Sequence, residues 1–168
     1  MCLQVFTDCS ADPSTKVGYG AALVLEEGDS RSLERIAEDI KLKRFEETSS
    51  SRLELETLLW ALGNLPRGAG RVVLFTDSQT IANLPARREK LEAVRFCSKS
   101  GVLLSQADLY REFYDVWDRN EMEVVKLSGH MPSIEKSRDD LVFSLLDRAA
   151  RSALRRNLSK SQAGGDGG

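Results

Sequence analysis

The sequence predicts a single α/β domain built on a five-stranded mixed sheet flanked by helices. Three β-prone segments come first, and a helix, a strand, further helices, a strand and a last helix follow. A length of 168 residues suits one domain with its own core. Short links favour antiparallel pairing of the first strands, whereas the central helix is a crossover that makes the fourth strand parallel to one of them.

The N-terminal third supplies the first three strands. They are expected at residues 3–7, 17–25 and within 32–47, the last partly exposed and charged. The first strand is short and delivers Asp8 at its end. The second contains Gly18 and Gly20, and glycines this dense in a strand suggest the close approach of another backbone or of a ligand.

The centre of the chain predicts a helix followed by a buried strand. Serines at 49–51 are candidate N-caps for a helix that runs to about residue 65. Its core-facing stripe has the spacing i, i+3, i+4, i+7 and consists of Leu55, Leu58, Leu59 and Leu62. Residues 71–76 form the clearest buried strand, which also ends in an aspartate, Asp77.

The C-terminal half predicts helices around 86–96 and 107–117, a strand at 122–127 and a long helix from 134 to about 156. We therefore place the folded domain at 1–157. The remaining residues, 158–168, are polar and Gly-rich and are expected to be a disordered tail.

Composition excludes several classes of function. With 24 Lys and Arg against 26 Asp and Glu, the net charge of −2 excludes nucleic-acid binding by bulk basicity. The single histidine, His130, excludes a multi-histidine metal site, so carboxylates must hold any metal. Three cysteines without CxxC spacing argue against a disulfide framework or structural zinc. Without a signal-peptide pattern or a membrane-spanning apolar run, we expect a cytoplasmic protein. A monomer is the default expectation for its oligomeric state.

Three carboxylates stand out in this pattern. Asp8 and Asp77 each follow a Phe-Thr pair at the end of a strand, where ligands of open α/β sheets bind. Either aspartate alone is more commonly a turn or helix-capping residue. Glu54 lies at the edge of the leucine stripe, where a charged group is costly unless it is paired or binds a metal. The alternative is a boundary glutamate whose stem reaches water.

The order and spacing of six short motifs resemble those of type 1 ribonuclease H over nearly the whole chain, residues 3 to about 156. The motifs are Phe6-Thr7-Asp8-Cys9-Ser10, Gly18-Tyr19-Gly20-Ala21, Ser51-Arg52-Leu53-Glu54-Leu55, Phe75-Thr76-Asp77-Ser78-Gln79, Ala107-Asp108-Leu109-Tyr110 and Leu127-Ser128-Gly129-His130. The resemblance implies a ribonuclease H-like fold and metal-dependent endonucleolytic hydrolysis of the RNA strand of RNA/DNA hybrids.

The resemblance also implies a metal site. The family's metal-binding carboxylates map onto Asp8, Glu54 and Asp77, and we choose Asp147 as the fourth because the sequence around it looks like the family's last helix. The alternatives are Asp140 and Asp139, which fit the usual spacing better. Two Mg²⁺ or Mn²⁺ ions suit an all-carboxylate site, where they activate water and stabilise the leaving oxygen.

His130 matches the position of a family histidine that assists water activation or product release. Its ordinary pKa of about 6.5 suits proton transfer near neutral pH. The alternative is a loop histidine with a satisfied hydrogen bond.

Substrate contacts follow from the same resemblance. Ser50, Ser51 and Gln79 occupy or adjoin positions where the family reads 2′-hydroxyl groups of the hybrid. Arg87, Arg88 and Lys90 occupy the place of the family's basic protrusion but lack its tryptophans, so a solvated helix face is equally plausible. Four arginines of the last helix are either solvating or phosphate-facing: Arg148, Arg151, Arg155 and Arg156.

A chain of this fold could serve two other functions. An exonuclease of this fold would carry Asp-x-Glu after the first strand, and the sequence has Asp8-Cys9-Ser10 instead. A catalytically weak or inactive module that binds hybrids as a scaffold is the remaining alternative. The presence of four carboxylates and His130 together argues for the enzyme.

Overall fold

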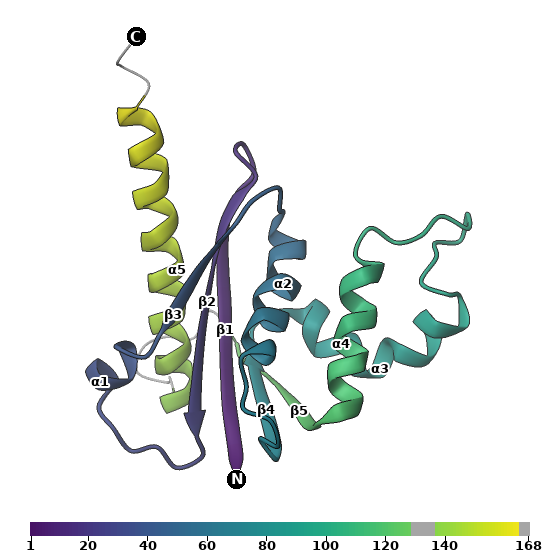
Figure 1. The fold of residues 1–168 in the computed structure, drawn as a ribbon, viewed down its shortest axis with the longest axis horizontal. Coiled ribbons are helices and arrows are strands. Elements are labelled where there is room, and N and C mark those ends of the chain that lie inside the picture. Colours follow the sequence, from purple (N-terminus) through teal and green to yellow (C-terminus); the bar gives the residue numbers. More distant parts are fainter. Residues whose placement is uncertain (129–136, 165–168) are drawn as a thin grey trace.

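The computed structural model describes residues 1–128 and 137–164 and contains a five-stranded mixed sheet of order β3-β2-β1-β4-β5 (Figure 1). The strands are β1 (Cys2–Asp12), β2 (Val17–Glu26), β3 (Lys41–Phe45), β4 (Arg71–Thr76) and β5 (Glu121–Lys126). β1, β2 and β3 pair antiparallel, and β4 lies parallel to both β1 and β5. The predicted mixed sheet is therefore confirmed.

Helices cover both faces of this sheet. They are α1 (Leu33–Ala37), α2 (Ser50–Gly63), α3 (Gln79–Ala93), α4 (Ala107–Arg119) and α5 (Arg138–Ala163). α2 lies on one face with α3 and α4 beyond it, and α5 lies on the other face with α1 (Figure 1). Each face has its own apolar core; stacked Phe6 and Phe75 rings, 4.5 Å apart, face the α5 side.

Asp8 does not end its strand, contrary to the prediction. β1 continues to Asp12, and Asp8 pairs with Ala21 of β2. The parallel pairing with β4 stops earlier, at Phe6 and Phe75. Asp8 therefore still lies just beyond the parallel part of the sheet, near the carboxyl end of β4, because the β1–β2 hairpin is longer than its neighbour.

The third strand is much shorter than the predicted 32–47 segment. Ser32 accepts a hydrogen bond from the Arg35 N–H and begins the short helix α1, whose Ile36 is fully buried. Only Lys41–Phe45 is a strand, and it pairs with residues 18–22 of β2. A single buried anchor in five residues is too weak a periodic signal to separate this helix from a charged strand.

The two β2 glycines lie where α2 crosses the sheet. A Cβ atom at Gly18 would overlap the Leu53 side chain, and one at Gly20 would overlap Thr57. The atoms that approach these glycines most closely belong to side chains of α2, not to another backbone or a ligand as predicted. This crossing fixes the height of α2 above β1 and β2.

Two helices are longer than expected. α3 begins at Gln79, capped by Ser78, and runs through Pro85, a residue that ordinarily disfavours the helix interior. α5 continues to Ala163, so residues 158–163, expected in a disordered tail, are helical. The predicted helix boundary was wrong because exposed polar residues give little apolar periodicity. Residues 165–168 lie outside the described part of the chain.

Across residues 1–128 and 137–164, none of the helices combines the length and apolar character needed to cross a membrane.

Candidate active site

Four carboxylates from four elements line one cavity of about 540 Å³. Asp8 comes from the middle of β1, Glu54 from the second turn of α2, Asp77 from the residue after β4, and Asp147 from α5. The cavity lies where the carboxyl end of β4, the long β1–β2 hairpin and the two helical layers meet. The structure thus brings together the four carboxylates that the sequence singled out.

Asp8 is a buried carboxylate with the negative charges of other carboxylates nearby. Its pKa is raised to about 8, chiefly by burial and to a smaller extent by the charges of Asp77 and Asp147 and by hydrogen bonding to Asp147. The backbone N–H of Cys9 acts in the opposite direction. A nearby cation would further stabilise the charged form of this carboxylate.

Glu54 accepts a hydrogen bond from Ser78, a serine that was not among the predicted site residues. Ser78 Oγ donates a hydrogen bond to Glu54 Oε2 at 2.6 Å. Ser78 Oγ also accepts a hydrogen bond from the Ile81 N–H at the start of α3. Burial raises the pKa of Glu54, the Ser78 hydrogen bond lowers it, and the charge of Asp77 raises it. A serine directly before a helix is a recognisable N-cap signal, but its contact with α2 is tertiary.

Replacing Ser78 with Ala is expected to reduce both stability and activity. Loss of the N-cap costs about 1 kcal/mol of unfolding free energy. Loss of the Glu54 hydrogen bond is expected to reduce nuclease activity about 10- to 100-fold, because Glu54 is no longer oriented. Urea unfolding and initial cleavage rates measure the two effects.

Ser32→Ala is the matched control, because Ser32 caps α1 away from the cavity. It is expected to destabilise the chain with its activity intact. Full activity of Ser78→Ala would contradict the assigned role of Ser78.

Asp147 lies well apart along α5 from the other two candidates for the fourth carboxylate, Asp140 and Asp139. Asp147 lines the cavity and forms an ion pair with Arg151, Nε to Oδ1 3.0 Å. Asp140 instead caps the helix, accepting hydrogen bonds from the N–H and Oγ of Ser137 at 3.0 and 2.7 Å. Asp139 is its neighbour in the same first turn, about 12 Å along the axis from Asp147. Neither Asp139 nor Asp140 lines the cavity.

Of the predicted substrate residues Ser50, Ser51 and Gln79, one lines the carboxylate cavity. Ser50 lines the cavity itself. Ser51 Oγ accepts a hydrogen bond from Gln106 Nε2 at 2.9 Å, and the Gln79 amide donates to Asn83 Oδ1. His130 falls within 129–136, outside the described residues.

The basic residues of α3 lie away from the carboxylate cavity. Arg88 forms ion pairs with Glu92 and with Asp118 of α4, and its guanidinium lies 5.1 Å from the centre of the Tyr114 ring. Arg88 therefore joins α3 to α4. Arg87 and Lys90 line a separate pocket of about 280 Å³.

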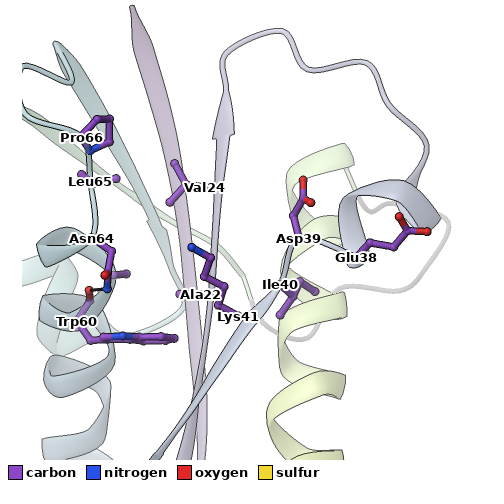
Figure 2. A pocket seen from close by; sticks show the side chains of 11 residues that line it. Ala22, Val24, Glu38, Asp39, Ile40, Lys41, Trp60, Asn64, Leu65 and Pro66 are labelled. Atoms are coloured by element: carbon purple, nitrogen blue, oxygen red, sulfur yellow. Dashed lines mark hydrogen bonds between the residues drawn. The ribbon is translucent and has the colours of Figure 1, made fainter.

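A third cavity, of about 460 Å³, lies at the part of β2 that β3 leaves uncovered. Figure 2 shows Trp60 and Asn64 of α2 on one side, Glu38 and Asp39 on the other, and Ala22 and Val24 between them. Its wall contains none of the four clustered carboxylates.

The carboxylate set fits divalent cations by its chemistry. Hard cations such as Mg²⁺ and Mn²⁺ prefer oxygen ligands. The pKa of Asp8 is raised first by burial and then by the negative charges of Asp77 and Asp147, and a cation would offset both effects. Across residues 1–128 and 137–164, however, no three His, Cys, Asp or Glu side chains are arranged as a formed metal site. Glu54 is bound to Ser78 and Asp147 to Arg151, so these side chains would have to turn toward an ion.

Comparisons with known proteins identify the family of the chain. The family model for RNase H matches residues 2–144, a range that includes Asp8, Glu54 and Asp77 and ends before Asp147. A ribonuclease H of Moorella thermoacetica is 32% identical over 160 residues, covering 92% of this chain and 94% of that protein.

A foamy viral protease-reverse transcriptase, solved in complex with dsDNA, has a similar fold. Its TM-score is 0.61 at 11% identity, covering 90% of this chain and 94% of that one. The ribonuclease H-like fold expected from the sequence is confirmed. The chain belongs to the ribonuclease H family, and it is a nuclease of the hydrolase class with ribonuclease H activity.

Proposed function

We propose that the chain is a metal-dependent endoribonuclease that hydrolyses the RNA strand of RNA/DNA hybrids with two Mg²⁺ or Mn²⁺ ions. The observation that supports this most directly is the convergence of four carboxylates on one cavity in a chain of this family. Such a donor set binds hard cations and can hold two of them near one phosphate.

Each carboxylate has a distinct proposed role. Asp8 is central, since the charges of both Asp77 and Asp147 act on it, and it would contact both ions. Glu54 and Asp77 would hold one ion and Asp147 the other. The bound ions supply water activation and stabilisation of the leaving oxygen.

The rest of the chain orients these groups and moves protons. Ser78 orients Glu54 through a hydrogen bond, and Arg151 orients Asp147 through an ion pair. His130 is proposed to move a proton at the reacting water or the leaving group, as its chemistry allows.

For the hybrid, we propose hydrogen bonds from Ser50, Ser51 and Gln79 to the minor groove, where 2′-hydroxyl groups distinguish RNA from DNA. Arg87 and Lys90 are proposed to contact backbone phosphates farther along the duplex. Arg88 is proposed to support them through its ion pairs with α4.

The decisive test is cleavage of an end-labelled RNA/DNA hybrid with Mg²⁺, Mn²⁺ or EDTA. We expect internal cuts in the RNA strand with either metal and none in EDTA. Equal cleavage of double-stranded DNA, or no cleavage of the hybrid with either metal, would contradict the proposal. Tight hybrid binding without cleavage would favour the inactive scaffold alternative.

The fourth ligand is tested by comparing Asp147→Asn, Asp140→Asn and Asp139→Asn. Asp147→Asn is expected to lose the most activity. Asp140→Asn is expected to affect mainly stability, because Asp140 caps α5. If Asp147→Asn alone is tolerated, the assignment is wrong.

A further inference from the structure

We propose that Arg155 of α5 forms a phosphate-binding subsite for the nucleic-acid strand that enters the carboxylate cavity. This inference rests on the proposed function and adds a binding site on α5 to it. It also distinguishes Arg155 from Arg148, Arg151 and Arg156, the neighbouring arginines of α5.

The wall of the carboxylate cavity extends along α5 beyond Asp147. Its lining residues on this helix are Asp147, Arg151, Leu154, Arg155 and Leu158. Positions 147, 151 and 155 are spaced i, i+4, i+8 and therefore share one helix face. Both arginines on that face thus belong to the same hollow as the four carboxylates.

This part of α5 is held firmly against the sheet. Ala150, Ala153 and Leu154 are buried, and Tyr19 of β2 donates a hydrogen bond from its hydroxyl to Asn157 Oδ1 at 3.3 Å. In Figure 1 the yellow end of α5 extends past the tip of the β1–β2 hairpin. The two arginines are therefore presented from an anchored helix.

The two arginines differ in their ion pairs. Arg151 is paired with Asp147, whereas Arg155 is exposed and forms no ion pair with any residue in the described ranges. Arg155 lies about 12 Å along the helix axis from Asp147. It is therefore placed to bind a phosphate away from the one at the carboxylates.

A phosphate-binding group beside this cavity would offset the repulsion between the carboxylates and a phosphodiester backbone. Four carboxylates around one hollow repel a phosphodiester backbone, and the chain has a net charge of −2. An unpaired guanidinium at the cavity wall attracts the backbone locally and can bind a phosphate with two parallel hydrogen bonds. Arg155 supplies this attraction without adding bulk basicity to the chain.

Arg156 provides a matched control. It is adjacent in sequence, equally exposed and of the same charge, but it is turned about 100° around the helix and does not line the cavity. A general effect of net charge would appear in both variants, whereas a subsite effect would appear only in Arg155→Ala.

The experiment compares Arg155→Ala, Arg155→Lys and Arg156→Ala with the wild type. Binding to a fluorescein-labelled RNA/DNA hybrid is measured by anisotropy in EDTA over a range of KCl, and KM and kcat are measured with Mg²⁺. We expect Arg155→Ala to weaken binding about three- to tenfold and to reduce the salt slope by about one. Its KM should rise while kcat is unchanged. Arg155→Lys should keep the salt slope, and Arg156→Ala should bind within about twofold of the wild type.

The two proposals fail in different ways. If the wild type cleaves the hybrid but Arg155→Ala and Arg156→Ala bind alike, the α5 subsite is wrong and the proposed function stands. If the wild type neither binds nor cleaves the hybrid, both proposals are overturned.

Discussion

Replacing Asp8 with Asn is expected to lower hybrid cleavage by at least about 100- to 1,000-fold. Asp8 is the carboxylate on which the charges of both Asp77 and Asp147 act, so it is the group best placed to share two cations. An amide has similar size and can still accept a hydrogen bond, but it supplies no negative charge. The measurement is the initial rate on a labelled hybrid with saturating Mg²⁺.

The control is Asp115→Asn, which makes the same chemical change at an exposed position of α4 outside the cavity. It should cleave the hybrid at the wild-type rate. Circular dichroism must show that Asp8→Asn is folded. If folded Asp8→Asn retained more than a tenth of the activity, Asp8 would not be the central ligand.

The unfolding free energy of the metal-free chain is expected to fall as the pH rises from about 4 to about 8. The pKa of Asp8 is about 8 in the folded chain and 3.8 in its ordinary state. A group with a raised folded pKa favours folding below its unfolded pKa, and this contribution is lost as the pH rises through the folded pKa. The slope from one such group reaches about 1.4 kcal/mol per pH unit, and burial of Glu54 acts in the same direction.

Asp8→Asn should remove most of this dependence, because its amide does not titrate. In EDTA the variant is therefore expected to be more stable than the wild type at pH 8 and closer to it at pH 5. At this chain length, each kcal/mol corresponds to about 2–4 °C in Tm. Mg²⁺ should stabilise the wild type more than the variant at pH 8. A pH-independent difference between the two proteins in EDTA would contradict this explanation.

The sequence was sufficient to predict the succession of strands along the chain and most of the candidate site residues. Strongly periodic segments such as β4 and α2 are recognisable from local pattern alone. Asp8, Glu54 and Asp77 lie in short motifs next to such segments, so their convergence followed from the sheet topology. Even the error over the end of β1 left Asp8 near the carboxyl end of β4.

Other features depend on contacts between distant residues and were missed. α1 is stabilised by one buried residue, Ile36, and α3 passes through Pro85 because its core-facing residues continue on both sides. Ser78 joins α3 to Glu54, and Arg155 rather than Arg156 lines the cavity because of the way α5 is turned against the sheet. No local pattern in the sequence records these distances.

The position of the cavity between two helical layers has a consequence for folding. Glu54 comes from the layer on one face of the sheet and Asp147 from the layer on the other, while Asp8 and Asp77 come from the sheet between them. A partly folded chain in which either layer is undocked cannot assemble the full set of carboxylates. Cation affinity therefore measures whether both helical layers are docked on the sheet, and the nuclease becomes competent only when both are docked.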